Sequence, residues 1–246
     1  MKVLGIIPAR YASSRLPGKP LSDIGGQSMI QRVYQRVVQT PLVDRVVVAT
    51  DDERILQHVQ SFGGLARMTS DTHQSGTDRC AEVARELKDY EIIINIQGDE
   101  PFINPADVGQ VIRLLQQDDG TQIATLGTPI NLQEDIFNPN VVKLVKAVND
   151  RALYFSRSAI PYLRNIPAEN WLKHATFIKH LGIYGFLRTS LLAVTELPPG
   201  NLEKLESLEQ LRWLEAGFSI RVGMTDQDSQ GIDTEEDLDR ARKMVD

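Results

Sequence analysis

The chain has 246 residues, 41% of them hydrophobic, which is enough for one large α/β domain or two small ones. Its 27 basic and 33 acidic side chains give a net charge of -6, and this excess of acid argues against a nucleic-acid partner. No apolar run approaches membrane-spanning length, so we expect no membrane partner either. The single cysteine, Cys80, excludes an intrachain disulfide, and we expect a soluble protein of the cytoplasm.

The first predicted element is an apolar strand over residues 3–7 that leads into a polar loop. Such a run is typical of a central strand buried on both faces, and open α/β sheets bind ligands at the carboxyl ends of their strands. Ser13, Ser14 and Gly18 add hydroxyl donors and close backbone approach to an oxyanion. Three cations lie within ten residues of this loop: Arg10, Arg15 and Lys19. The loop predicts a polyphosphate cradle with neither Walker nor dinucleotide-fingerprint spacing, and a solvated basic loop is the alternative.

Helical and strand patterns alternate from residue 28 to residue 117. Parallel neighbours need a crossover, which a helix usually provides, so this alternation predicts an α/β fold with a doubly wound, mostly parallel sheet. We expect helices near 28–39, 55–62, 80–87 and 104–117, and strands at 45–50, 65–69 and 92–96.

The pattern changes between residues 122 and 188, where strand-like runs follow one another with little helical periodicity. We expect this block to form antiparallel strands inserted into the sheet or appended to it. Helical periodicity returns in the leucines from Leu202 to Leu214 and ends at Gly217, before a strand and a last helix from Thr234. One domain over residues 1–246, with residues 122–188 as its elaborated part, is the simplest organisation.

Carboxylates follow two of the predicted strands at positions suited to a metal. Asp99 comes just after a buried strand, and Gly98 before it lets a ligand approach closely. Mg²⁺ takes one or two carboxylates and completes its shell with substrate phosphates, so Asp99 predicts a magnesium site. Asp233 is the weaker candidate, because Thr234 and Asp237 have capping-box spacing and helix capping alone explains the segment.

Two further pairs of polar residues have a functional and a structural interpretation. Ser75 and Gly76 lie in a polar loop before a helix, where they can contact a nucleobase edge, and the alternative is that the loop only caps that helix through Thr77 or Asp78. Glu209 and Gln210 lie on the leucine-patterned segment, where such residues are more often part of a solvated helix face.

Three side chains near the predicted strands of the middle block can line an acid-binding pocket. They are Arg157, His180 and Tyr184. Each is weak evidence alone, because a single histidine or tyrosine on a strand is more often a packing residue. The sequence itself therefore leaves both a pocket and a packed sheet surface open.

Taken together, these residues resemble the cytidylyltransferases that activate 3-deoxy-manno-octulosonate (Kdo) as its CMP derivative. The resemblance covers nearly the whole chain, and its segments occur in the same order. They are residues 7–20, 73–77, 95–101, 154–157, 180–185, 208–212 and 233–234. The first segment is also similar to sialic acid cytidylyltransferases, but the unbroken run of residues 15–20 resembles the Kdo branch.

The resemblance implies a nucleotidyltransferase of Rossmann-like fold that joins CTP and Kdo into CMP-Kdo and pyrophosphate for lipopolysaccharide biosynthesis. The nucleotide site that it implies comprises Ala9, Arg10, Arg15, Lys19, Ser75, Gly76 and Gln97. The implied Mg²⁺ ligands are Asp99 and Asp233. The implied sugar-acid pocket comprises Arg157, His180, Tyr184, Glu209 and Gln210, with Arg157 facing the substrate carboxylate. Catalytic roles would fall to Arg10, Lys19, Gln97, Asp99 and Asp233.

One position departs from the family pattern, because Phe186 stands where a tyrosine is expected. If that hydroxyl touches the sugar, the acceptor could be the 8-amino analogue of Kdo. A sialic acid enzyme and a nucleotide-binding module without turnover are two rival interpretations of the chain. The resemblance also implies a homodimer whose interface lies in residues 122–188.

Overall fold

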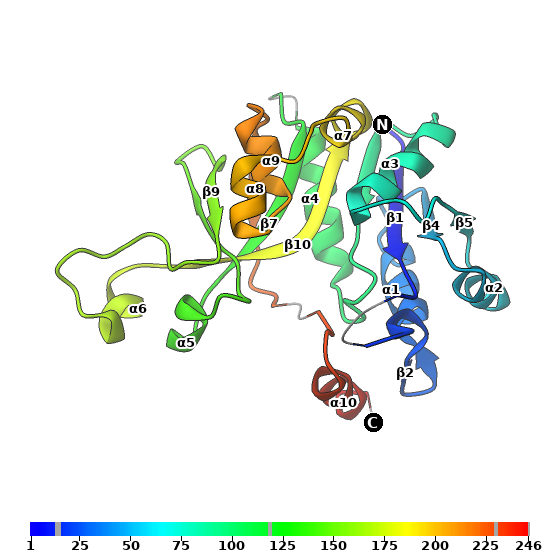
Figure 1. Ribbon diagram of the computed structural model, residues 1–246, viewed down its shortest axis with the longest axis horizontal. Coiled ribbons are helices and arrows are strands. Elements are labelled where there is room, and N and C mark those ends of the chain that lie inside the picture. The colour runs from blue at the N-terminus through cyan, green and yellow to red at the C-terminus, as the bar shows by residue number, and fades with distance from the viewer. Residues whose placement is uncertain (13–15, 118–119, 229–230, 246) are drawn as a thin grey trace.

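The computed structural model describes residues 1–12, 16–117, 120–228 and 231–245. Its described part forms a nine-stranded sheet with helices on both faces, and a two-stranded hairpin at one end (Figure 1). The main path through the sheet has the order β11-β7-β10-β6-β1-β4-β5. Its strands are β1 (Val3–Ala9), β4 (Arg45–Thr50), β5 (Ala66–Met68), β6 (Ile92–Asn95), β7 (Ile123–Pro129), β10 (Ile178–Leu187) and β11 (Ile220–Met224).

Neighbours on this path run parallel except at β10, which is antiparallel to both β6 and β7. The prediction of a doubly wound, mostly parallel sheet is therefore confirmed. β1 lies between β4 and β6, with Gly5 opposite Val46 on one side and Ile94 on the other. Because both of its neighbours are parallel to it, the carboxyl ends of β1, β4 and β6 open at the same edge of the sheet.

The helices that cover the main sheet divide between its two faces, as a doubly wound sheet requires. One face is covered by α1 (Met29–Val38), α2 (Glu53–Ser61) and α4 (Pro105–Gln116). The other is covered by α3 (Gly76–Glu86), α7 (Arg188–Thr195), α8 (Asn201–Glu206) and α9 (Gln210–Glu215). No helix in the described part of the chain has the length and apolar character needed to cross a membrane.

The middle block contributes β7 and β10 to the main sheet and folds most of the chain between them into a projecting arm, residues 130–177 (Figure 1). Within the arm, β8 (Lys143–Lys146) pairs antiparallel with β9 (Ala152–Ser156) and with β10, which confirms the expected antiparallel strands. β7 departs from the expected antiparallel block, because it runs antiparallel to β10 on one side but parallel to β11 on the other. The arm also holds short helical elements that the sequence did not predict: α5 (Gln133–Phe137), η2 (Ala168–Asn170) and α6 (Trp171–His174). These are too short for a helical period to appear in the sequence.

The prediction of one helix through the leucines is wrong. The chain forms α8 and α9 with a turn between them, in which Ser207 has the left-handed angles φ 51° and ψ 48°. Leu208 and Leu211 pack in the same core, whereas Leu205 is 74% exposed. The leucine spacing thus reports a shared buried side across two short helices. The turn that separates them carries Glu209, so the break decides where that side chain points.

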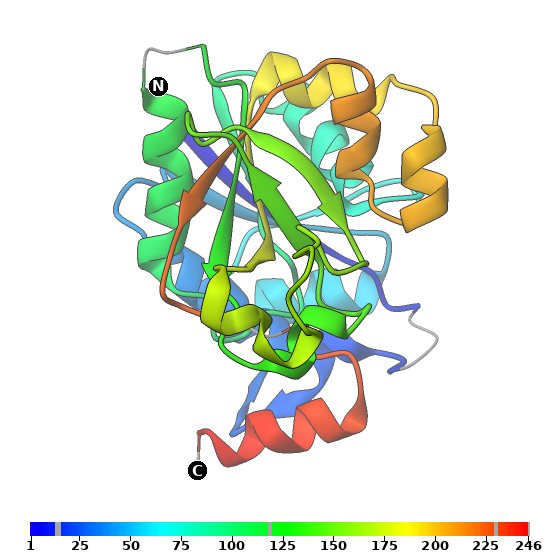
Figure 2. The ribbon, with the colours of Figure 1, turned by 90° about the vertical axis from the view of Figure 1, so that its left-hand side faces the viewer.

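The C-terminal helix α10 (Glu235–Lys243) lies apart from the sheet, beside the hairpin of β2 (Asp23–Ile24) and β3 (Gln27–Ser28) (Figures 1 and 2). Its apolar side packs against the short segment around a 3-10 turn, η1 (Lys19–Leu21). This satellite core comprises Leu16, Ile24, Met29, Ile232, Leu238 and Ala241. The segment that leads into α10 therefore returns to the first loop, next to the carboxyl ends of the parallel strands.

A tight contact between β10 and α4 gives the first prediction. A Cβ atom at Gly185 would lie 2.5 Å from Val111 and 2.7 Å from Leu115. Gly185→Ala is therefore expected to destabilise the protein by about 1–3 kcal/mol, because the core is already filled there. Chemical denaturation measures this loss. Gly109→Ala is the matched control, since its Cβ would meet only the flexible side chain of Arg113 within α4, and it is expected to be neutral or stabilising. Equal stability of the two variants would contradict the prediction.

Candidate active site

A cavity of about 460 Å³ opens at the carboxyl ends of β1 and β6. Its walls come from the first loop, the loop before α3, the turn after β6 and the segment before α10. The residues that line it are Pro8, Ala9, Arg10, Lys19, Pro20, His73, Gln74, Ser75, Gly76, Arg79, Gln97, Gly98, Asp99 and Asp233. The structure thus brings together the described residues predicted for the nucleotide and the metal, from four distant parts of the sequence.

Lys19 lies between the two predicted metal ligands. Its Nζ is 2.6 Å from Oδ2 of Asp99 and 3.1 Å from Oδ1 of Asp233. The chain's own ammonium group therefore occupies a position where one cation neutralises two carboxylates. Among the described residues, no group of three or more histidine, cysteine, aspartate or glutamate side chains gathers as a metal cluster. A two-carboxylate set suits Mg²⁺ that takes its remaining ligands from phosphates and water.

Helix capping and the backbone together hold Asp233 at the cavity. Thr234 caps α10 and forms a capping box with Asp237, as its spacing predicts. The backbone N–H of Ile232 donates to the carbonyl oxygen of Asp99 at 2.9 Å, which ties the segment before α10 to the turn after β6. The capping interpretation and the site interpretation of this segment are therefore compatible, because Thr234 caps the helix while the Asp233 carboxylate faces Lys19.

Tyr11 joins the two described ends of the first loop. The N–H of Gly18 donates to the carbonyl oxygen of Tyr11 at 3.0 Å, and a Cβ at Gly18 would lie 3.1 Å from the Tyr11 ring. The guanidinium of Arg54, from α2, stacks 3.3 Å above the centroid of that ring. The predicted donors Ser13, Ser14 and Arg15 lie outside the described residues. The loop ends are fixed by aromatic and cationic packing, and Arg10 and Lys19 extend from them toward the cavity.

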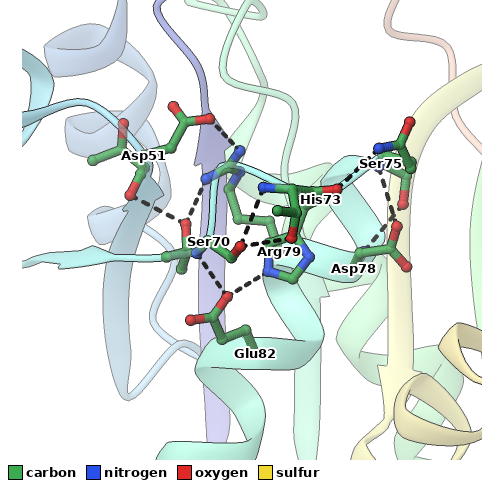
Figure 3. Close-up of polar contacts among 11 residues, drawn as sticks. Asp51, Ser70, His73, Ser75, Asp78, Arg79 and Glu82 are labelled. Carbon is green, nitrogen blue, oxygen red and sulfur yellow. Dashed lines mark hydrogen bonds and ion pairs between the residues drawn. The ribbon is translucent and has the colours of Figure 1, made fainter.

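Paired charges form the wall before α3 (Figure 3). Arg79, only 4% exposed, donates to the carboxylate of Asp51 at 2.7 Å and to the hydroxyl of Thr69. His73 contacts the Glu82 carboxylate, which also accepts a hydrogen bond from the backbone. These pairs connect the cavity wall to the end of β4 and to the body of α3. Neither Arg79 nor His73 was among the predicted site residues, although His73 begins one of the segments that carry the family resemblance, because a charge in a polar stretch gives no signal of burial.

The hydroxyl of Ser75 is occupied by protein contacts. Ser75 is the N-cap of α3 and forms a capping box with Asp78. Its hydroxyl also donates to Oε1 of Glu209 at 3.0 Å, and Thr77 donates to Oε2 of the same carboxylate at 2.7 Å. The loop does cap α3, but the N-cap is Ser75 and not Thr77 or Asp78 as the sequence suggested. Any contact from Gly76 to a base is left to its backbone. Glu209, predicted on the solvated face of a helix, instead joins α9 to the cavity wall.

Burial of this carboxylate gives a pH-dependent prediction. Desolvation raises the pKa of Glu209, against the opposing effect of the hydrogen bonds from Thr77 and Ser75. Between the unfolded and folded pKa values the folded state binds more protons, so ionisation of Glu209 destabilises the fold as pH rises. Glu209→Gln is therefore expected to gain stability relative to the wild type as the pH rises above the ordinary glutamate pKa of about 4.3. Chemical denaturation at a series of pH values measures the difference, and a difference independent of pH would contradict it.

Arg157 is occupied by backbone carbonyl groups. Its Nε donates to the carbonyl oxygen of Glu206 at 2.7 Å, and its two terminal nitrogens donate to those of Pro139 and Ser207 at 2.9 and 3.3 Å. The guanidinium thus bridges the arm and the turn between α8 and α9. These bonds use three of the five guanidinium N–H groups, so a substrate carboxylate would have to bind the remaining two or displace one of the carbonyl groups.

The other residues predicted for a sugar pocket lie on the α9 side of β10 and do not line the cavity described above. His180 Nε2 lies 3.0 Å from the hydroxyl of Thr125, and desolvation lowers the pKa of His180 to about 3. The hydroxyl of Tyr184 is buried and has no hydrogen-bond partner among the described residues. Gln210, 5% exposed, begins α9 beside them. Tyr184 and Gln210 are buried and His180 is half-buried, and the three groups are close to neutral, which suits binding of hydroxyl groups more than binding of charge.

Two contacts join this polar group to the cavity. Gln97 lines the cavity and donates to the carbonyl oxygen of Gly182, in β10, at 3.1 Å. Glu209 provides the second link through Ser75. Gly98 has a packing role besides any approach of a ligand, since a Cβ there would lie 2.9 Å from the carbonyl oxygen of Pro8.

Phe186 lies in the core and not at a binding surface. Its ring is 0% exposed and packs edge-on against Trp213, with 5.2 Å between ring centroids. A tyrosine at this position would therefore place the base of its ring inside the core, away from any binding surface. Phe186 therefore makes no direct contact through which this departure from the family pattern would change the acceptor sugar.

The doubly wound sheet, with cations and two carboxylates around a cavity at its carboxyl edge, defines a nucleotidyltransferase of the α/β class. Comparison with known proteins narrows this class. A family model described as cytidylyltransferase matches residues 4–222. The chain belongs to the cytidylyltransferase family. It is 52% identical over 246 residues to the 3-deoxy-manno-octulosonate cytidylyltransferase of Parabacteroides distasonis, covering 98% of this chain and 97% of that protein.

Solved structures agree with this assignment. CMP:2-keto-3-deoxy-manno-octonic acid synthetase complexed with CTP is 45% identical and superposes with a TM-score of 0.93, covering 100% of this chain and 98% of that chain. A cytidylyltransferase from Leptospira borgpetersenii has a TM-score of 0.66 at 18% identity, over 100% of this chain and 87% of that one. This more distant likeness concerns the fold alone.

Proposed function

We propose that the protein transfers the cytidylyl group of CTP to Kdo, giving CMP-Kdo and pyrophosphate for lipopolysaccharide biosynthesis. The observation that carries the proposal is the cavity lined by Arg10, Lys19, Asp99 and Asp233, in a chain so similar to Kdo cytidylyltransferases. The two carboxylates beside these cations argue against a binding module without turnover. The acceptor would lie on the side of Gln97, toward β10 and the turn before α9.

The chemistry is a direct displacement. The anomeric hydroxyl of the sugar acid attacks the α-phosphorus of CTP, a bond from sugar oxygen to phosphorus forms, and the bond to the β-phosphate oxygen breaks. Pyrophosphate leaves with the bonding electron pair, and the hydroxyl proton passes to solvent. Such transfers depend mainly on positioning and on neutralisation of charge, so Arg10 and Lys19 would bind and orient the triphosphate.

Asp99 and Asp233 would hold Mg²⁺ at this site. The residues fit the ion, because two carboxylates already converge on one ammonium group and leave the other ligands to phosphate and water. Bound there, Mg²⁺ would neutralise phosphate charge and lower the pKa of the attacking hydroxyl. Lys19 would then exchange its two carboxylate partners for the triphosphate.

A pyrophosphate-release assay over a matrix of substrates tests the proposal. CTP, UTP and GTP would each be combined with Kdo, its 8-amino analogue and sialic acid, in the presence of Mg²⁺. Rapid release with CTP and Kdo alone is the expected result. Faster pyrophosphate release with sialic acid or the amino sugar than with Kdo would identify that sugar acid as the acceptor. CTP binding without pyrophosphate release for any acid would indicate a binding module.

We also propose a cytoplasmic homodimer whose interface lies in residues 122–188. Large apolar side chains of this block are exposed: Leu132, Phe137, Val148, Leu153 and Tyr162. In the described sheet β9 pairs only with β8, so its other edge offers unpaired backbone groups that a second copy can cover. Size-exclusion chromatography with light scattering would give the mass in solution, and a monomer at micromolar concentration would contradict the dimer.

A further inference from the structure

The turn between α8 and α9 is held in a conformation that its sequence does not favour. Ser207 adopts left-handed backbone angles, which cost a side-chain-bearing residue energy and persist only where the surroundings impose them. The turn also interrupts an apolar pattern that would otherwise favour a continuous helix. The backbone N–H of Leu208 donates to the carbonyl oxygen of Glu203 and closes the turn locally, and contacts from the end of β9 add to this bond.

Glu206 supplies those contacts from the last position of α8. Its Oε1 accepts a hydrogen bond from the Ser156 hydroxyl at 2.7 Å, and its Oε2 accepts one from the backbone N–H of Arg157 at 2.9 Å. In return, the Arg157 guanidinium donates to the carbonyl oxygens of Glu206 and Ser207. Ser156, Arg157, Glu206 and Ser207 thus form a reciprocal set of bonds between the end of β9 and the turn, which we call the turn clamp.

A buried lysine extends the turn clamp into the arm. Lys143 is 0% exposed, and its Nζ donates to the carbonyl oxygens of Asn138, Val141 and Arg157 at 2.9, 2.7 and 2.5 Å. Desolvation, and then the charge of Arg157, lowers the pKa of Lys143, whereas the charge of Glu206 opposes that shift. Glu206 therefore offsets the charge of Lys143 and Arg157 at this junction, and Asp135 adds a smaller effect of the same sign on Lys143.

The opposite side of the turn faces the cavity. Glu209, three residues after Glu206, accepts hydrogen bonds from Ser75 and Thr77 in the first turn of α3. Ser75 is independently fixed by its capping box with Asp78. The cavity wall therefore keeps its place if the turn moves, while Arg157, Glu209 and the residues between them shift relative to that wall.

We propose that Glu206 is a positioning residue for the acceptor side of the site. Its carboxylate fixes the end of β9 to the turn before α9, and thereby sets where Arg157 and Glu209 stand opposite the nucleotide cavity. The inference rests on the proposed function, because it assigns these two residues to the side that receives the sugar acid. Glu206 makes no direct contact with the nucleotide cavity, so its effect is separable from nucleotide binding.

Steady-state kinetics of Glu206→Ala with CTP and Kdo tests the assignment. Loss of both acceptor oxygens is expected to raise the KM for Kdo at least about tenfold, with the KM for CTP within about twofold of the wild type. Glu206→Gln keeps one carbonyl acceptor and can donate to Ser156, so it should restore most of the affinity for Kdo. Ser156→Ala removes a single donor and should give a smaller shift of the same kind, and it is the variant to use if Glu206→Ala fails to fold.

Glu203→Ala is the matched control, because it removes an ion pair with Arg212 from the same two helices without touching the arm. It is expected to lower the melting temperature while leaving the KM for Kdo within about twofold of the wild type. An equal rise of the two KM values in the Glu206 and Ser156 variants would overturn the inference, and so would a rise in KM for Kdo in Glu203→Ala. No turnover by the wild type with Kdo would overturn the proposed function and the inference together. An active wild type, with an unchanged KM for Kdo in the Glu206 and Ser156 variants, would overturn the inference alone.

Discussion

Asp99→Asn is expected to lower the turnover number at saturating CTP, Kdo and Mg²⁺ by at least about a hundredfold, as for other preorganised charges at transferring groups. The substitution keeps the size of the side chain and removes its charge. It therefore leaves Lys19 with Asp233 as its only carboxylate neighbour in the pair described above, and it halves the anionic set that would hold the metal. Pyrophosphate release measures the loss, and Asp233→Asn should show it as well.

The control for both carboxylates is Asp239→Asn, in α10, whose side chain is 59% exposed and pairs with Arg242 on the helix surface. Its turnover is expected to stay within about twofold of the wild type. A near-normal rate for Asp99→Asn at saturating Mg²⁺ would remove Asp99 from the metal site. Equal losses in all three variants would instead point to a change in the fold around α10.

The first half of the fold could be predicted from the sequence because its elements carry strong local signals. The apolar run that forms β1, and the helical spacing of Ile30, Val33 and Val37 in α1, each determine one element with little outside help. Ser28 and Asn104 cap α1 and α4 as their positions suggest. The break at Ser207 could not be predicted in this way, since the segment around it also bonds to Ser156 in β9, fifty residues before Glu206 in the chain.

The candidate site, too, could be predicted from the sequence only in part. Chain polarity alone brings Arg10 and Asp99 to one edge of the sheet, so the position of the cavity could be predicted from the order of the strands. What each charged group contacts could not, because Lys19 with Asp233 and Ser75 with Glu209 are pairs separated by more than a hundred residues. The resemblance to a family named several residues that the cavity does bring together. It did not give the bonds that they make within the protein.

Lys19→Met should change two measurements in opposite directions. Loss of the ammonium group is expected to raise the KM for CTP at least about tenfold, because a charge-assisted bond to the triphosphate disappears. The same loss should tighten the binding of Mn²⁺, used as a probe for Mg²⁺, about threefold or more in the absence of nucleotide. The reason is that Nζ of Lys19 lies 2.6 and 3.1 Å from the two carboxylates that the metal would use.

Titration of the nucleotide-free protein with Mn²⁺, followed by electron paramagnetic resonance, separates this exchange from general damage to the site. Lys146→Met is the control, since it removes a lysine that pairs with Asp150 in the arm, away from the cavity, and it should alter neither measurement. Weaker Mn²⁺ binding in Lys19→Met would mean that the ammonium group helps to assemble the carboxylates and does not compete for them. Tighter Mn²⁺ binding together with a higher KM for CTP would identify Lys19 as a counter-ion that is released when CTP and the metal bind. Only a group that neutralises the carboxylates first and the triphosphate afterwards gives both effects.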